Sequence, residues 1–169
     1  GGLLTGLTNV TFETWVTFPG TGNNWQRIFD FGSASTATTG SYVFLTPALS
    51  SGGSCRVAIG TAGSNSETAA GGAAANGAAL TAGAHQIVVI LDDTNSTVSI
   101  YVDGTLGQSV GWTGTVASIT NTNSYLGRSN FAADAYLGAT LDEFRMYRVA
   151  LTQAQLRTSR AMGPNATFF

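Results

Sequence analysis

An aspartate, Asp142, lies in the alternating segment Leu141–Tyr147 and is the residue with the clearest chemical consequence. In a strand, Asp142 would share a face with Phe144 and Met146. A carboxylate on an apolar face is costly unless a cation, an arginine or backbone amides satisfy it. We therefore expect Asp142 either to bind a structural calcium ion, which takes oxygen ligands, or to pair with Arg128 or backbone amides. The sequence leaves both alternatives open.

Paired carboxylates would indicate a second kind of chemistry, because glycoside hydrolysis needs two of them in one cleft, about 5 to 9.5 Å apart. On a single strand this requires two acids at positions two or four apart. Glu13, Glu67 and Glu143 have no acid at either spacing, and Asp142 and Glu143 point to opposite faces. We predict that the domain is not an enzyme. A glycan-active enzyme stays the least favoured alternative, since acids on different strands can meet.

Three aromatic residues near expected loops, Trp25, Trp112 and Tyr125, are candidates for binding a sugar. An exposed aromatic ring offers an apolar face on which a sugar ring stacks, with a polar group at its edge in Trp and Tyr. Most aromatic side chains of a β-sandwich belong to its core. At each of the three positions, a role in ligand binding therefore competes with a role in the core.

The composition excludes several classes of partner. Charged residues make up 9% of the 169 residues, against roughly a quarter in an average domain, and all seven basic residues are arginine. A net charge of −2 without a basic patch argues against nucleic acid. No apolar run approaches the roughly 18 to 20 residues that membrane insertion requires. The Gly, Ala, Ser, Thr and Asn that must cover the surface favour an extracellular or cell-surface protein.

Three Asn-x-Ser/Thr sequons, at Asn9, Asn95 and Asn165, are candidate N-glycosylation sites. Chance produces such sequons in a chain this rich in Asn, Ser and Thr, so they permit a secreted glycoprotein without establishing one. Asn95 lies in an expected turn and is the best acceptor of the three.

Short alternating segments separated by Gly, Asn, Ser and Asp predict an all-β fold: a two-sheet antiparallel β-sandwich with one short C-terminal helix. The expected strands are Thr11–Phe18, Trp25–Phe31, Tyr42–Leu45, Arg56–Ile59, Ile87–Leu91, Val98–Val102 and Leu141–Tyr147. In the second of these, alternation places Arg27 on the face of Phe29 and Phe31. The segment Gly60–Gly83 is expected to be a loop with at most one weak strand near Glu67.

A capping box from Thr152 to Gln155 predicts the start of the helix, because Thr152 can accept a bond from a first-turn amide while Gln155 reaches back. Val149, Leu151 and Leu156 would dock this helix onto the sandwich. We expect residues 1–162 to form one domain and residues 163–169 to be a C-terminal connector or edge segment.

Five segments in order resemble the laminin-G-like (LamG) domains of the concanavalin A-like lectin-glucanase jelly-roll class. They are Thr11–Val16, Trp25–Gly32, Val98–Gly104, Leu126–Ser129 and Leu141–Tyr147. The resemblance covers nearly the whole chain. It implies two antiparallel sheets packed face to face, no catalytic residues in the domain itself and, as in many relatives, a structural calcium beside the strand of Asp142. The Glu-x-Asp-x-x-Glu strand of the glucanase relatives is absent.

These observations together predict a non-catalytic extracellular module for binding or adhesion, with a carbohydrate or an extracellular protein as its ligand. The resemblance implies that such a module belongs to a larger secreted or surface protein and contacts other domains or a self-assembling partner. The alternative from a different class is a structural building block of an extracellular filament, sheath or cell wall. Binding of glycans would favour the first function, and self-assembly without a soluble ligand would favour the second.

Overall fold

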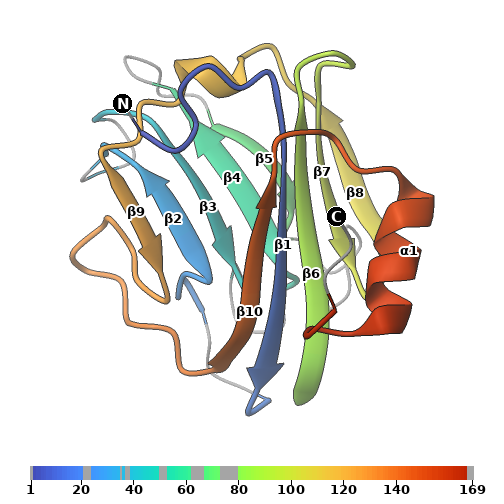
Figure 1. Cartoon of the computed structure of the whole chain (residues 1–169). Helices are drawn as coiled ribbons and strands as arrows, with labels where there is room; N and C mark the ends of the chain where they lie inside the picture. Colours follow the sequence, from blue (N-terminus) through green and yellow to red (C-terminus); the bar gives the residue numbers. More distant parts are fainter. Residues whose placement is uncertain are drawn as a thin grey trace.

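Two antiparallel sheets of five strands each pack face to face and form a sandwich (Figure 1). The computed structural model describes residues 2–20, 24–34, 36, 39–49, 53–61, 67–72 and 80–166. Within these ranges, one α-helix follows the last strand. The predicted fold class, an all-β sandwich with a short C-terminal helix, is confirmed.

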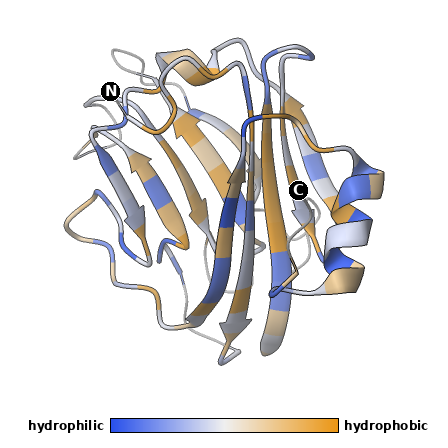
Figure 2. Ribbon diagram, in the orientation of Figure 1, coloured by the Kyte–Doolittle hydropathy of each residue, from blue (hydrophilic) through white to orange (hydrophobic). Residues whose placement is uncertain are grey.

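The first sheet has the strand order β10-β1-β6-β7-β8. Its strands are β1 (Asn9–Phe18), β6 (Gly83–Asp92), β7 (Thr97–Val102), β8 (Thr105–Gly111) and β10 (Thr140–Tyr147). The predicted apolar run Ile87–Leu91 lies in β6, the central strand, and all of its side chains are buried. Figure 2 shows β6 as hydrophobic along its middle. A central strand covered on both faces needs apolar side chains in both directions, which explains why this run does not alternate.

The second sheet has the strand order β5-β4-β3-β2-β9. Its strands are β2 (Phe29–Gly32), β3 (Tyr42–Thr46), β4 (Arg56–Gly60), β5 (Glu67–Gly71) and β9 (Asn123–Leu126). The weak strand expected near Glu67 is β5. The sequence does not predict β8 or β9, which each form an edge of a sheet. Their segments contain few apolar residues, TLGQSVG in β8 and NSYL in β9, so neither carries a clear alternation.

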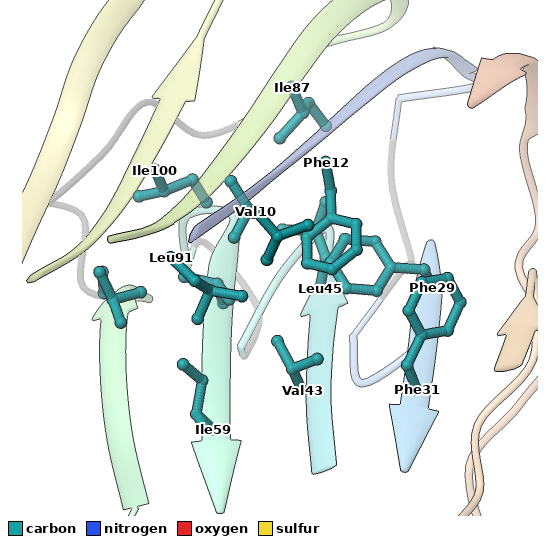
Figure 3. Packing of buried hydrophobic residues seen from close by; sticks show 14 of the residues in the cluster. Val10, Phe12, Phe29, Phe31, Val43, Leu45, Ile59, Ile87, Leu91 and Ile100 are labelled. Carbon is teal, nitrogen blue, oxygen red and sulfur yellow. The ribbon is translucent and has the colours of Figure 1, made fainter. Parts of the chain in front are cut away.

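The main core lies between the two sheets and takes side chains from both of them (Figure 3). The ring of Phe12 in β1 lies 4.8 Å from the ring of Phe29 in β2, and Phe144 of β10 lies 5.7 Å from Phe29. Each buried aromatic side chain removes roughly 150–250 Å² from water, so contacts of this kind dominate the packing energy. They determine how the two sheets stack.

The strand predicted over Trp25–Phe31 is shorter than expected and begins at Phe29. Trp25 has a φ of +58°, and the backbone before Phe29 does not alternate. As a result, two consecutive residues, Ile28 and Phe29, both enter the main core. The prediction that Arg27 shares the face of Phe29 is therefore wrong: Arg27 lies on the opposite face with Asp30.

The predicted position of Asp142 on the apolar face is also wrong, because β10 contains a bulge. The register between β1 and β10 shifts between Trp15 and Val16, and Asp142 is the unpaired extra residue. An extra residue reverses the alternation of side chains along a strand. Leu141 and Phe144, three positions apart, therefore both pack against the core, and Asp142 is exposed.

The C-terminal helix α1 (Gln153–Met162) begins at the predicted capping box. The amide of Gln155 donates to the side chain of Thr152, and the amide of Thr152 donates to Gln155 Oε1 at 2.8 Å. The backbone amide of Gly163 then ends the helix by donating to the carbonyl of Ser159 at 3.0 Å. No helix among the described residues is long and apolar enough to cross a membrane.

Helix α1 covers part of the outer face of the first sheet (Figure 1). Leu151 and Leu156 pack there with Val88 and Ile90 in a second apolar cluster. Val149, which we expected to help dock the helix, is instead 53% exposed. Docking therefore depends on two of the three predicted apolar residues.

A buried carboxylate, Glu13 of β1, ties helix and sheet together beneath α1. Its oxygens accept hydrogen bonds from Gln86 Nε2 at 2.6 Å, from the Tyr147 hydroxyl at 2.9 Å and from the Ser159 hydroxyl of the helix. Arg145 Nη1 lies 3.3 Å away and supplies the opposite charge. A fully buried acid is tolerated because its desolvation is offset by an ion pair and several hydrogen bonds.

Of the segment that follows the helix, residues 163–166 are described. Pro164 accepts a hydrogen bond from Arg145 through its carbonyl, so this part of the segment contacts β10. Residues 167–169 lie outside the described residues, and the role of 163–169 as a connector or edge segment stays a prediction.

We predict that Tyr147→Phe destabilises the protein by about 1–2 kcal/mol near pH 7, because Glu13 loses a hydrogen bond. Burial and the bond to Glu13 raise the pKa of Tyr147 to about 12. A raised folded-state pKa means that this stabilisation is complete below pH 10 and is lost as pH rises through about 12. Urea unfolding at pH 7, 10 and 12 tests this. A wild-type advantage that stays constant up to pH 12 would contradict it.

Candidate functional site

The outer face of the second sheet gathers most of the polar and aromatic groups that have no place in the main core. The strand register places two rows of side chains there, side by side across neighbouring strands. One row consists of Asp30, Phe44, Ala58 and Ala69. The other consists of Tyr42, Gly60 and Glu67. We take this outer face as the candidate site.

Three aromatic rings form a small second core on this face. Tyr42 and Phe44 stack with centroids 5.4 Å apart, and Phe131 meets them edge-on at 5.6 and 6.3 Å. The ring of Tyr42 lies flat over Gly60, where an added Cβ would come within 2.4 Å of it. Glycine at this position therefore allows the Tyr42 ring to lie against the sheet. Phe131 belongs to the segment between β9 and β10, which covers this part of the face.

Arg27 is fully buried within this cluster. Its guanidinium carbon lies 3.8 Å from the centroid of the Phe44 ring, a cation–π contact. Arg27 Nη2 lies 2.8 Å from Asp134 Oδ2, and Nε lies 3.6 Å from Asp30 Oδ2. Burial lowers the pKa of Arg27, and the two carboxylates oppose this effect. Both terminal nitrogens of the arginine are thus engaged within the protein.

Asp30 attaches the segment that follows β9 to the face of the sheet. Its carboxylate accepts hydrogen bonds from the backbone amide of Asn130 at 2.9 Å and from Asn130 Nδ2 at 2.8 Å. The Ser129 hydroxyl lies 3.2 Å from Asp30 Oδ2 and 2.9 Å from Asp134 Oδ2. Burial raises the pKa of Asp30, and the bonds from Asn130 oppose the rise. The two acids meet at the Ser129 hydroxyl, but Asp30 is fully buried and cannot exchange a proton with a substrate.

A second arginine, Arg56 of β4, pairs with Glu67 of β5 at the far side of the face. The Tyr42 hydroxyl donates to Glu67 Oε2 at 2.8 Å. Burial, and then the bond to Glu67, raise the pKa of Tyr42. Glu67 remains 28% exposed, so this end of the cluster is open to solvent.

Trp25 lies beside the buried Arg27 and is 42% exposed. Its backbone amide donates to the carbonyl of Ala48 at 3.0 Å, and its own carbonyl accepts a bond from Arg27 Nη1. The Arg27 guanidinium lies 5.8 Å from the centroid of the indole ring. Of the three predicted ligand residues, Trp25 is the one that the structure presents as an open aromatic surface.

The other two predicted ligand residues are placed differently. Trp112 is 3% exposed and packs in the main core, so the expectation that it faces a ligand is wrong. Tyr125 of β9 lies opposite Asp30 and is half-buried. The Arg128 guanidinium lies 4.7 Å from its ring centroid and covers one side of it. The structure therefore does not bring the three aromatic residues together.

Asp142 lies apart from this face, at the exposed start of β10, and accepts a hydrogen bond from Thr17 Oγ1 at 2.9 Å. Its expected partner Arg128 stacks on Tyr125 instead. Among the described residues, no group of three His, Cys, Asp or Glu side chains is arranged to hold a metal ion. Calcium binding at Asp142 stays a prediction.

The predicted glycosylation sites lie at three different kinds of position. Asn9 is half-buried at the start of β1, and its Nδ2 donates to Thr94 Oγ1 at 3.0 Å. Asn95 is exposed in the turn between β6 and β7, with its amide bonded to Asp92 Oδ2 at 2.7 Å. Asn165 is exposed after the helix. Glycosylation at each stays a prediction.

A hollow of about 600 Å³ lies elsewhere, between residues 2–5 and 117–124. The described residues that line it carry no charge and no aromatic ring, and they offer only hydroxyls, one side-chain amide, backbone and aliphatic groups. The outer face of the second sheet is chemically richer, and we keep it as the candidate site.

Sequence reasoning missed Arg27, Asp30, Tyr42 and Phe131 as parts of this site. One signal was available, because Asp30 lies between two phenylalanines in a strand and must point away from them. The role of Phe131 had no such signal, since it depends on how the segment after β9 folds back over the sheet.

We predict that Arg27→Met lowers the free energy of unfolding by about 3–5 kcal/mol, because Asp30 stays buried without the guanidinium group of Arg27 beside it. Urea unfolding of Arg27→Met, Asp30→Asn and the double variant measures this. The double variant should lose less stability than the two single variants together, because it removes both charges and leaves no buried charge without a partner. Strictly additive losses would show that the two side chains do not stabilise each other.

The two alternatives for Asp142 give different outcomes in a melting experiment with Asp142→Ala. A bound calcium ion would raise the melting temperature of the wild type and leave that of the variant unchanged. A carboxylate that only accepts a bond from Thr17 would give equal melting temperatures in calcium and in chelator. The exposed position leads us to expect the second outcome, and the first would establish the calcium site.

Comparison with solved structures shows the same fold in several proteins. The CBM40 of the Ruminococcus gnavus IT-sialidase, bound to alpha2,3 sialyllactose, matches with a TM-score of 0.68 at 16% identity, over 92% of this chain and 84% of that one. Domain 4 of AbnA, a GH43 extracellular arabinanase from Geobacillus stearothermophilus, in complex with arabinotriose, matches with a TM-score of 0.69 at 20% identity, over 92% and 68%.

A botulinum neurotoxin type C structure, from a study of its interaction with two ganglioside molecules, matches with a TM-score of 0.63 at 10% identity, over 94% of this chain and 36% of that one. No curated protein matches the sequence. A family model of the laminin G type, described as the concanavalin A-like lectin/glucanases superfamily, matches residues 2–157. The chain therefore belongs to the concanavalin A-like lectin/glucanases superfamily.

Proposed function

We propose that this chain is a non-catalytic carbohydrate-binding module and that a glycan binds at the edge of the outer face of the second sheet, on Trp25. Membership of the superfamily supports a role of this kind. Among proteins of the same fold, one structure contains sialyllactose, one contains arabinotriose, and one comes from a study of ganglioside binding. Fold alone does not decide function, so the proposal depends on the site.

The observation that carries the proposal is the way in which Trp25 is held. A bulky residue with a φ of +58° is rare, and such strain persists only where the surroundings enforce it. Here two hydrogen bonds hold the backbone of Trp25: its amide donates to the carbonyl of Ala48, and its carbonyl accepts from Arg27 Nη1. The indole ring is exposed, while the backbone that carries it is hydrogen-bonded through both its amide and its carbonyl. A sugar can stack on such a ring with little loss of side-chain freedom.

Polar groups beside Trp25 supply the directional contacts that a sugar needs. Asp134 is partly exposed and pairs with Arg27, the arginine that also lies beside the Trp25 ring. Gln26 Oε1 accepts a bond from the amide of Gly138 at 2.7 Å, which ties the β9–β10 segment to the residue next to Trp25. That segment also carries Tyr136, which is largely exposed and provides a second aromatic surface.

The buried state of two acids supports the non-catalytic part of the proposal. Asp30 lies beneath the segment that follows β9, and Glu13 lies beneath α1. Neither carboxylate is accessible to a glycosidic bond, and both accept hydrogen bonds from other residues of the protein. A module of this type acts by holding its parent protein near a glycan, and we place it in an extracellular or surface-attached protein.

We predict that Trp25→Ala lowers the affinity for the glycan by at least tenfold, because the sugar loses the ring on which it stacks. The chain has three tryptophans, and Trp15 and Trp112 are buried, so ligand-induced changes in intrinsic fluorescence should come from Trp25. Titration with oligosaccharides, followed by fluorescence and by calorimetry, measures both effects.

The matched control is Leu106→Ala on β8 of the other sheet, because Leu106 is 44% exposed, close to the value for Trp25. This control should bind as the wild type does. Glycan binding that survives in Trp25→Ala would move the site away from Trp25, and glycan cleavage by the wild type would overturn the non-catalytic assignment.

A further inference from the structure

Two arginines of the outer face of the second sheet, Arg27 and Arg56, are already paired with acids of the same cluster. We infer from this that the module selects neutral glycans over carboxylate-bearing ones such as sialylated glycans. The inference rests on the proposed carbohydrate-binding function and goes beyond it by naming the chemical class of the ligand. Binding of a sugar carboxylate in a protein site relies on a guanidinium whose N–H groups are free to form a bidentate pair.

Arg27 does not meet this requirement. One terminal nitrogen donates to the carbonyl of Trp25, and the other lies 2.8 Å from Asp134. Its flat face is covered by Phe44, and the side chain is fully buried. Only its Nε lacks a hydrogen bond, and this atom is buried 3.6 Å from Asp30. A ligand carboxylate would have to displace two protein acceptors to reach this arginine.

Arg56 is also paired. Its Nη2 donates to Glu67, and Nη1 is buried. Glu67 is the more exposed partner of this pair, so the group that a ligand meets first at this end of the face is a carboxylate. A sugar carboxylate placed there would be repelled by Glu67 before it gained anything from Arg56.

The number of charged groups in the cluster also disfavours an acidic ligand. Three carboxylates, Asp30, Glu67 and Asp134, surround two guanidinium groups, Arg27 and Arg56. Burial lowers the pKa of Arg27, and the other four groups all lie close enough to affect it as well: the three carboxylates raise it and Arg56 lowers it. The cluster therefore holds an excess of negative charge, which opposes a second anion and leaves hydroxyl groups as the preferred contacts.

Arg128 is the strongest counter-argument, because it is exposed and stacks on Tyr125 at 4.7 Å from the ring centroid. An ion pair at a solvent-exposed position contributes little to binding, because water and salt screen it. A pair with Arg128 alone would therefore give a sugar carboxylate little advantage over a neutral sugar. Arg128 also presents a flat surface to a neutral sugar ring, so its position is compatible with the inferred ligand class.

The test compares neutral with acidic glycans: 3′-sialyllactose is lactose with one added sialic acid, and trigalacturonic acid is an acidic trisaccharide to set against the neutral arabinotriose. Lactose, 3′-sialyllactose, arabinotriose and trigalacturonic acid are titrated into the wild-type protein by calorimetry at 50 and 500 mM NaCl. We expect the tightest ligand to be neutral, each acidic glycan to bind at least tenfold more weakly than that ligand, and the affinity of the neutral ligand to change less than twofold with salt.

Two other outcomes would overturn the inference, and one of them would also overturn the proposed function. An acidic glycan as the tightest ligand, or an affinity that falls several-fold in high salt, overturns the inference and leaves the proposed function intact. A folded protein that binds none of these oligosaccharides, nor the neutral and acidic members of a wider glycan array, overturns the proposed function together with the inference.

Glu67→Gln tests whether the paired acids are the cause of the selectivity. This variant unpairs Arg56 and should raise the affinity for sialyllactose, relative to that for the neutral ligand, by at least tenfold. Asp142→Asn, measured in chelator, removes the same charge from an exposed acid that bonds to Thr17, and should leave this ratio unchanged. An unchanged ratio in Glu67→Gln, with an intact fold, would overturn the explanation by charge pairing.

Discussion

Four phenylalanines, Phe12, Phe29, Phe31 and Phe144, hold the two sheets together. Their ring centroids lie between 4.8 and 6.2 Å apart, and they come from β1, β2 and β10, so the cluster joins one sheet to the other. Alternating side chains on the same strands must then point outward. The rest of the structure depends on this constraint, because each outer face has to accommodate the groups that the core rejects.

Both outer faces meet this requirement in the same way, with a fully buried acid and an arginine beneath a covering segment. On the first sheet, Glu13 pairs with Arg145 under helix α1. On the second, Asp30 lies beside Arg27 under the segment that follows β9. The helix brings its own apolar cluster to its face. The irregular segment leaves Trp25 open at its edge, and this difference decides which face can meet a ligand.

The sequence predicted the elements that carry a strong pattern. Thr11–Phe18 and Leu141–Tyr147 became β1 and β10, and the capping box at Thr152 begins α1. The strands β8 and β9 were missed, because their segments TLGQSVG and NSYL contain few apolar residues and show no clear alternation. Of the three predicted ligand aromatics, Trp25 is exposed and Trp112 is buried. Their local sequences do not distinguish these two environments.

The amino-acid sequence by itself determined the fold class, the superfamily and the position of the helix, because period-two patterning, turn residues and a capping box are local properties. Only the tertiary structure decided which way individual side chains point. A bulge turned Asp142 outward, and an irregular entry to β2 moved Arg27 to the face of Asp30. One inserted or strained residue reverses the alternation of a strand, and such a residue depends on the pairing of strands that are distant in the sequence.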